Sequence, residues 1–266
     1  MENSDKNIVI PSVPSLDREF VYYKPEEVFE YINPIMLYNK HLGYTGIFQK
    51  KLEAGDAKTI KLNNTVEEMK MLVREEDAIT PKGVYQYFHC KSDGDKINLF
   101  RRNTDEVVAS LHFDRQQKEP FLSATDYISS TEPDVMALFI VTGGNEYLKY
   151  ANKKKEEGHY LESHILHALA LESAEATAEL VHKRIRQEWG IYEEQSMKEM
   201  HKAKYQGIRL SFGYPACPDL DQQQTMFDLL KPHEIGVTLT EEMMMVPECS
   251  VSALVFHHPE GEYFSV

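Results

Sequence analysis

Residues 83–102 read GVYQYFHCKSDGDKINLFRR. The stretch alternates along its length and is rich in aromatic and β-branched residues, which is typical of strands. The segment SDGD at 92–95 is typical of a hairpin turn. Its Asp93-Gly94 pair favours antiparallel pairing of the flanking strands over a parallel crossover. The stretch therefore predicts a β-hairpin, and with it an antiparallel sheet.

Further elements are predicted on both sides of this hairpin. Alternating or apolar runs predict more strands at 107–117, 136–144, 235–240 and 250–257. Helical patterns lie at 24–32, 34–43, 65–77, about 146–189, 193–204 and 222–232. Helices bracket the strands without regular βαβ alternation, so the sequence favours the α+β class with an antiparallel sheet. Residues 1–19 are polar, contain two prolines and have no clear period, so we expect an N-terminal arm there.

Three helix boundaries have specific signals. Thr65 and Glu68 have the spacing of a capping box, which predicts that a helix begins at Thr65. The long Ala/Leu-rich helix is expected to end at Gly190, because glycine readily adopts the left-handed conformation that follows a helix. Pro232 is expected to stop the helix that precedes it.

Composition excludes several classes of protein. The chain has 266 residues and a net charge of -14, with 43 acidic and 29 basic residues, which disfavours a nucleic-acid partner. No apolar run reaches the roughly 18–20 residues of a membrane span, and the N-terminus lacks a signal pattern. Three widely separated cysteines favour neither a disulfide framework nor a CxxC metal site. We therefore expect a cytoplasmic protein with no membrane partner.

The histidines give no clear metal site. His164 and His167 lie three residues apart on the long helix, a spacing compatible with one metal-binding face. No acidic ligand is placed to complete such a site, and no HExxH motif is present. A solvent or core role is favoured for both, and no metal site is predicted.

Four polar residues share one face of the long helix. Glu175, Glu179, His182 and Arg186 are spaced i, i+4, i+7 and i+11. Small residues surround Glu175, which allows a backbone or a ligand to approach closely. On the pattern alone, a solvated stripe of salt-bridged residues is favoured over a binding site.

Residues 207–219, GIRLSFGYPACPD, form a loop that is rigid by composition. Pro215 and Pro218 fix two backbone torsions and disfavour helical geometry in the residues before them, which predicts an extended, stiff loop. Its free amides could read the edge of a planar ring, and the Arg209 fork suits a carboxylate or phosphate. Cys217 has no basic neighbour in sequence, so a nucleophilic role is disfavoured. These residues alone leave a ligand loop and a structural turn equally open.

The order of motifs along the chain resembles a known family. The motifs are TPKGVYQYF (80–88), GDKINLF (94–100), FIVTGG (139–144), ALALESAEATAELVHKRIR (168–186) and YQGIRLSFGYPACPDL (205–220). Together they resemble the activation, or reactivation, domain at the C-terminal end of cobalamin-dependent methionine synthase, over roughly 20–266. The resemblance implies a C-shaped α+β domain with a bent antiparallel sheet flanked by helices.

The resemblance also implies a function and its partners. The family's domain binds S-adenosylmethionine and caps the corrinoid of a cobalamin-binding partner after the cobalt has been oxidised to cob(II)alamin. An electron from flavodoxin or another reductant then permits methyl transfer from S-adenosylmethionine. The implied cofactors are thus S-adenosylmethionine and the partner's cobalamin, and no residue of this chain is implied to be catalytic.

The implied ligand site can be carried over residue by residue. Arg209 matches the arginine that pairs with the ligand's carboxylate, and Glu175 matches an acidic residue near the ligand's cationic groups. The resemblance also implies that the nucleoside loop and the C-terminal segment line the site, through Tyr214, Pro215, Ala216, Tyr263 and Phe264. At the position of Asn33 the family often has an aspartate that contacts the ligand's amino group. Asn33 is expected to accept a hydrogen bond from that group but to supply no negative charge.

The sequence also departs from the whole enzyme. The Asp-x-His-x-x-Gly motif of the cobalamin module is absent, and there is no homocysteine or folate barrel. The chain is therefore expected to be unable to make methionine alone, and to act on a separate methionine synthase or to be an excised piece. Two alternatives stay open: a reactivator of another corrinoid methyltransferase, and a docking module without catalytic use of the ligand.

Overall fold

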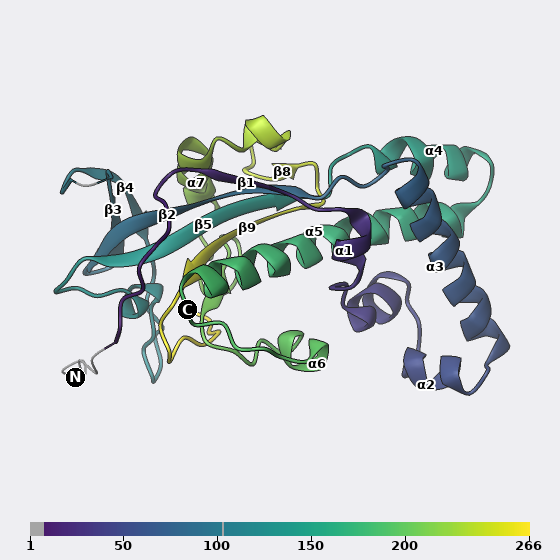
Figure 1. The fold of residues 1–266 in the computed structure, drawn as a ribbon, viewed down its shortest axis with the longest axis horizontal. Helices are drawn as coiled ribbons and strands as arrows, with labels where there is room; N and C mark the ends of the chain where they lie inside the picture. Colours follow the sequence, from purple (N-terminus) through teal and green to yellow (C-terminus); the bar gives the residue numbers. More distant parts are fainter. Residues whose placement is uncertain (1–7, 103) are drawn as a thin grey trace.

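The computed structural model describes residues 8–102 and 104–266, which form an antiparallel sheet with helices packed against it (Figure 1). The sheet has seven strands: β1 (Glu19–Tyr22), β2 (Lys82–Asp93), β3 (Lys96–Phe100), β4 (Val107–His112), β5 (Asp134–Thr142), β6 (Ile208–Leu210) and β9 (Ser250–Phe256). Their order is β4-β3-β2-β5-β9-β6, and β1 also pairs with β2. The α+β class is confirmed. So is the hairpin, in which Asp93 pairs with Lys96.

Most of the helices that precede the long helix form a second part of the molecule beside the sheet, and the others lie on or near the sheet. The helices are α1 (Pro25–Phe29), the π-helix η1 (Ile35–His41), α2 (Phe48–Glu53), α3 (Ala57–Glu75), α4 (Tyr147–Glu156), α5 (Tyr160–Glu188), α6 (Met197–Met200) and α7 (Gln223–Leu230). The short 3₁₀ helices are η2 (Ala124–Tyr127), η3 (Leu220–Gln222) and η4 (Pro232–Ile235). A small hairpin is made by β7 (Thr238–Leu239) and β8 (Met245–Val246).

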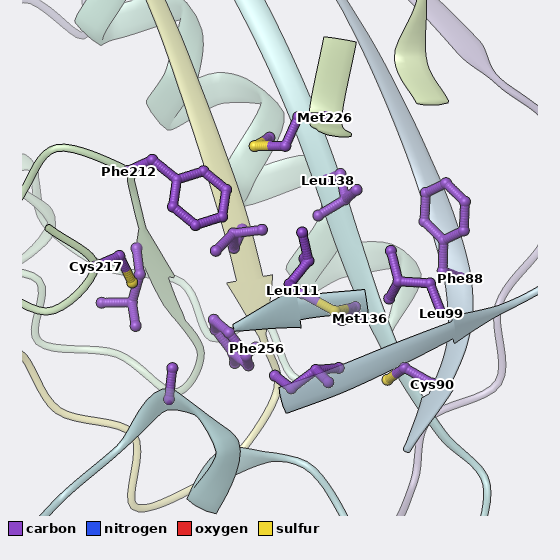
Figure 2. Close-up of a cluster of buried hydrophobic side chains, with 14 of the residues drawn as sticks. Phe88, Cys90, Leu99, Leu111, Met136, Leu138, Phe212, Cys217, Met226 and Phe256 are labelled. Carbon is purple, nitrogen blue, oxygen red and sulfur yellow. The ribbon is translucent and has the colours of Figure 1, made fainter. Parts of the chain in front are cut away.

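The central strand β5 is buried on both faces, which explains its unbroken apolar sequence. Alternate residues point to opposite sides of the sheet. Met136 and Leu138 belong to the cluster covered by α7, in which Figure 2 shows Met226 above Leu138. Val135 and Phe139 belong to the cluster covered by the C-terminal half of α5. The two apolar clusters fix α5 and α7 on opposite faces of the sheet.

Helix α5 joins the two parts of the molecule. Its first half packs on α1, α3 and α4 through Ile165, Leu166 and Leu169, and its second half lies on the sheet through Val181 and Ile185 (Figure 1). It ends as predicted, because Gly190 adopts a left-handed φ of 71° directly after the C-cap. A single unbroken helix therefore packs against both the helical group and the sheet.

The predicted start of the helix at Thr65 was wrong. The helix α3 begins at Ala57, where Asp56 caps it by accepting a hydrogen bond from the Thr59 amide at 2.9 Å. Thr65 lies inside the helix, and its hydroxyl donates to the Lys61 carbonyl, four residues earlier. Thr65 and Glu68 do have the spacing of a capping box, but the helix begins eight residues earlier, at Ala57.

Other boundaries also differ from those predicted. The segment 34–43 forms the π-helix η1, and α6 is only four residues long, shorter than 193–204. Strands β1, β6 and β8 were not predicted, because runs of two to four residues carry too little periodicity. Of the predicted N-terminal arm, residues 1–7 lie outside the described residues, and 8–18 contain no helix or strand.

Two negative findings concern the described part of the chain. None of its helices combines the length and apolar character needed to cross a bilayer. Within the same residues, no group of three or more histidine, cysteine or acidic side chains could hold a metal ion. His164 instead hydrogen-bonds the His41 carbonyl at 2.8 Å, and His167 packs its ring edge-on against Tyr147.

Candidate functional site

Two adjoining cavities, of about 570 and 890 Å³, lie where α5, β6 and the C-terminal segment meet. Both fall within the size range of small-molecule sites. They share the side chains of Glu175, Arg209, Tyr214, Ser250, Val251 and Tyr263. The smaller cavity also contains Asn33, and the larger contains Pro215, Ala216 and Phe264. All eight residues predicted from the sequence therefore line one joined space.

The Gly213–Cys217 segment is a closed turn, so the predicted extended loop was wrong. The Cys217 amide donates to the Tyr214 carbonyl at 2.8 Å, and the Gly213 amide donates to the Cys217 carbonyl at 2.8 Å. The Cys217 amide is thus already used inside the turn and is not free to read a ligand. The turn leaves the Tyr214 ring 62% exposed over the cavity.

Cys217 lies on the core side of the turn, near Phe212 (Figure 2). Its side chain is buried, and burial raises the pKa of the thiol to about 12. A thiol with that pKa carries almost no thiolate at neutral pH, which agrees with the disfavoured nucleophilic role.

Arg209 holds the centre of the site from the edge strand β6. Ile208 and Leu210 enter the core under α7, so Arg209 between them points to the opposite face, toward α5. Its Nη1 donates to Oε2 of Glu179 at 2.6 Å, and its Nη2 lies 3.7 Å from Oε2 of Glu175. Burial alone would lower the pKa of Arg209, but Glu179, Tyr205 and Glu175 together more than offset it and the net shift is upward. The guanidinium is charged at every working pH.

The polar face of α5 is buried, contrary to the solvated stripe favoured from the pattern. Glu179, His182 and Arg186 are 8%, 0% and 1% exposed. Of the four, only Glu175 is well exposed, with its side chain at 50%. Burial, followed by the charges of Arg209 and Arg186, holds the pKa of His182 well below its ordinary value, so this histidine is neutral. The spacing correctly places the four residues on one face. Tyr205 and β6 cover that face, and because they are distant in sequence, its burial could not be predicted from the helix alone.

The remaining predicted residues border the joined space. The Asn33 Oδ1 accepts a hydrogen bond from the Ile35 amide at 3.0 Å, at the start of the π-helix η1, an element often found at functional sites. Tyr263 is 56% exposed at the junction of the two cavities. Phe264 is partly buried against the core and packs edge-on to Tyr127. Phe264 therefore supports the wall of the site more than it faces the space.

Sequence reasoning missed several residues of the site. Glu179 and Tyr205, which contact or neighbour Arg209, were not named as site residues. Glu172 also lines the smaller cavity, 3% exposed, with its Oε1 2.9 Å from Nε2 of His41. Burial, and next the charge of Glu175, raises the pKa of Glu172 to about 7. The available signal was the i, i+3, i+7 spacing of Glu172, Glu175 and Glu179, which puts three carboxyl groups along one side of α5.

Opposite charges meet at the centre of the joined space. A guanidinium fork binds a carboxylate, and an exposed carboxylate such as Glu175 attracts a cation. The exposed rings of Tyr214 and Tyr263 offer flat apolar surface beside both charges. This arrangement suits a zwitterionic ligand that also has a flat ring system.

Comparison with known proteins gives the family. Residues 26–266 match the family model described as vitamin B12 dependent methionine synthase, activation domain. The chain belongs to this family. The chain is similar to the methionine synthase of Mycobacterium tuberculosis, with 36% identity over 200 residues, which is 69% of the chain. The methionine synthase of Mycobacterium leprae is 34% identical over 200 residues, also 69% of the chain. These matches span only 17% of the length of either relative.

The activation-domain fold is also found among solved structures. The structure described as the MetH reactivation domain bound to AdoHcy superimposes with a TM-score of 0.90 and 29% sequence identity. The match covers 97% of this chain and 84% of that one. The resemblance seen in the sequence is thereby confirmed for both family and fold.

Proposed function

We propose that this chain binds S-adenosylmethionine in the joined cavities, with Arg209 and Glu175 at the centre. The observation that carries the proposal is the convergence of all eight predicted residues on one space. The similar reactivation domain was solved with S-adenosylhomocysteine bound, which supports a ligand of the same class.

Each residue has a physical reason for its proposed role. The Arg209 fork pairs with the ligand's carboxylate, and the Glu175 carboxylate attracts the ammonium and sulfonium groups. The loop residues Tyr214, Pro215 and Ala216 line the nucleoside, and Tyr263 and Phe264 close the other side. Asn33 offers a neutral acceptor to the amino group.

The proposed role is to support reductive remethylation of inactive cob(II)alamin on a separate cobalamin-dependent methionine synthase. The partner's corrinoid is the methyl acceptor, and flavodoxin or a similar cytoplasmic reductant supplies the electron. This chain's own part is to bind the methyl donor, orient its sulfonium toward the partner and exclude water from the transfer. It carries no group that we assign a catalytic step.

Titration calorimetry with S-adenosylhomocysteine and S-adenosylmethionine tests the binding proposal. We expect one site per chain for both ligands. Absence of binding by the wild-type protein up to millimolar ligand would refute it.

A second measurement tests the proposed role. The chain is mixed with a cobalamin-loaded methionine synthase fragment that lacks its own activation domain, a reductant and methyl-labelled S-adenosylmethionine. We expect the cob(II)alamin spectrum to disappear and label to appear on the corrinoid. Transfer only to another corrinoid methyltransferase would support the first alternative, and binding without transfer would support the docking module.

A further inference from the structure

Glu179 is held by two hydrogen-bond donors from the 205–209 segment and by an ion pair with Arg186 on its own helix. The Arg209 Nη1 donates to Oε2 at 2.6 Å, and the Tyr205 hydroxyl lies 3.2 and 3.3 Å from the two carboxylate oxygens. The Arg186 Nη2 lies 3.6 Å from Oε1. A buried carboxylate with this many partners has few alternative positions.

The layer beneath Glu179 is also fixed. The Arg186 guanidinium is 1% exposed and lies over the Tyr205 ring, 3.7 Å from its centroid. His182 packs edge-on against the same ring and is neutral. The buried groups Arg186, Arg209 and Glu179 thus carry two positive charges and one negative. The half-exposed Glu175 carboxylate, 3.7 Å from Nη2 of Arg209, supplies the remaining negative charge.

The two ends of the Arg209 fork differ in what they contact. The Nη1 is engaged by Glu179 at hydrogen-bond distance. The Nη2 lies 3.7 Å from the half-exposed Glu175 carboxylate, too far for a hydrogen bond. The Nη2 edge is therefore the one presented to an incoming carboxylate.

We infer that Glu179 is a positioning residue: held by Arg186 and Tyr205, it fixes the Arg209 fork and thereby confers selectivity for ligands with a carboxylate. Glu179 stays bound to Nη1 when the ligand's carboxylate takes the Nη2 edge. The inference rests on the proposed function, because it assumes that Arg209 binds that carboxylate. In the opposite arrangement, Glu179 occupies the Arg209 fork and the ligand's carboxylate must displace it. Neutralising Glu179 would then raise the affinity for the ligand instead of lowering it.

The test compares two ligands on Glu179→Gln. S-adenosylhomocysteine has the carboxylate, and its decarboxylated analogue keeps the amino group and the nucleoside. Glutamine keeps one acceptor but loses the charge that holds the guanidinium, and a hydrogen bond between charged groups is worth about 1.5–3 kcal/mol. We therefore expect the affinity for S-adenosylhomocysteine to fall about 10- to 100-fold, and that for the analogue by less than about threefold.

Glu188→Gln is the matched control. Glu188 is on the same helix, and it too is held by an arginine and tyrosines, Arg184, Tyr85 and Tyr87, but it lines neither cavity. We expect this variant to bind both ligands like the wild type. If Glu179→Gln does not fold, Tyr205→Phe removes one donor to Glu179 and is expected to show the same selective loss, about two- to tenfold.

The outcomes are distinguishable. Failure of wild type to bind S-adenosylhomocysteine refutes the proposed function and the inference with it. Normal wild-type binding with an equal loss of both ligands in Glu179→Gln shows a merely structural role and overturns the inference alone. A gain in affinity for S-adenosylhomocysteine overturns it as well, because it shows that Glu179 competes for the fork.

Discussion

Two buried regions lie on opposite faces of the same sheet and are built from opposite chemistry. The apolar cluster under α7 includes Met136, Leu138 and Met226. The polar cluster on the α5 side consists of Glu179, His182, Arg186, Tyr205 and Arg209. Burial of the apolar cluster stabilises the fold by removing hydrocarbon surface from water. Burial of the polar cluster carries a desolvation cost that opposes the stabilisation from its internal pairs.

The polar cluster is not fully satisfied. Among the described residues, Nε and Nη1 of Arg186 and both ring nitrogens of His182 have no hydrogen-bond partner. Buried polar groups without hydrogen-bond partners are uncommon, and the Arg186 guanidinium is instead stacked on the Tyr205 ring. We therefore expect substitutions in the apolar cluster to change mainly the free energy of unfolding. Substitutions in the polar cluster should change mainly the affinity for the ligand.

Leu138→Ala should have the largest effect of any single substitution proposed for the two regions, and it should act only on folding. Leu138 is fully buried in β5, and truncating such a leucine destabilises proteins by about 2–5 kcal/mol. Denaturant unfolding would measure the loss, and calorimetry on the folded variant should give unchanged affinity for S-adenosylhomocysteine. A large change in affinity would contradict the separation of the two regions.

Arg209→Met should show the reverse pattern. Removing the fork leaves the ligand's carboxylate without its partner, so affinity should fall by about 2–3 kcal/mol, or about 30- to 150-fold. The free energy of unfolding should change less, because Arg186 and Tyr205 still hold Glu179. Equal affinity in wild type and variant would show that the polar cluster is not where the carboxylate binds.

Glu172→Gln should change the pH dependence of stability. Because burial raises the pKa of Glu172 to about 7, above the ordinary value of 4.5, the folded state favours the protonated acid. The stability that this acid contributes is present below pH 4.5 and is lost as pH rises to about 7. The variant has no such loss, so we expect it to gain about 2–3 kcal/mol over wild type between pH 5 and pH 8.

Unfolding by urea at several pH values would measure this difference. His41 contacts Glu172 at 2.9 Å, so both proteins are compared in a His41→Gln background, from which its own titration is absent. A difference that stays constant with pH would mean that Glu172 titrates near its ordinary value.

Asn33→Asp should have the smallest effect, and it should increase affinity. An aspartate keeps the acceptor for the Ile35 amide and adds a negative charge beside the cavity. A partly exposed charge pair is worth up to about 1 kcal/mol, so affinity for S-adenosylmethionine should rise about two- to fivefold. The gain should shrink at high salt. An unchanged or weaker affinity would place the ligand's amino group away from residue 33.

Much of the fold follows from local sequence. Three local patterns predict the sheet and the long helix, because each indicates a single type of structure. They are the Asp93-Gly94 turn, the apolar run of β5 and the helix end at Gly190. The start of α3 could not be placed, because Asp56 caps it without the fuller pattern seen at Thr65. Strand β6 exists only because it pairs with β9.

The site was predictable only in part. The eight residues named from the sequence meet in one space, but their state of burial depends on elements far apart in the chain. Neither the pairing of Glu179 with Arg209, 30 residues away, nor the closure of the turn at Cys217 has a periodic signal. The first arises where β6 lies against α5 and the second from backbone hydrogen bonds inside the turn, and sequence spacing alone specifies neither.

The continuity of α5 has a thermodynamic consequence for ligand binding. Its 29 residues carry Glu175 and Glu179 on backbone that is already ordered by packing at both ends. Fixing a free residue costs about 1–2 kcal/mol in conformational entropy, and this wall of the site incurs none of that loss when a ligand arrives. On the protein's side, the entropic penalty of binding then falls mainly on exposed side chains such as Tyr214.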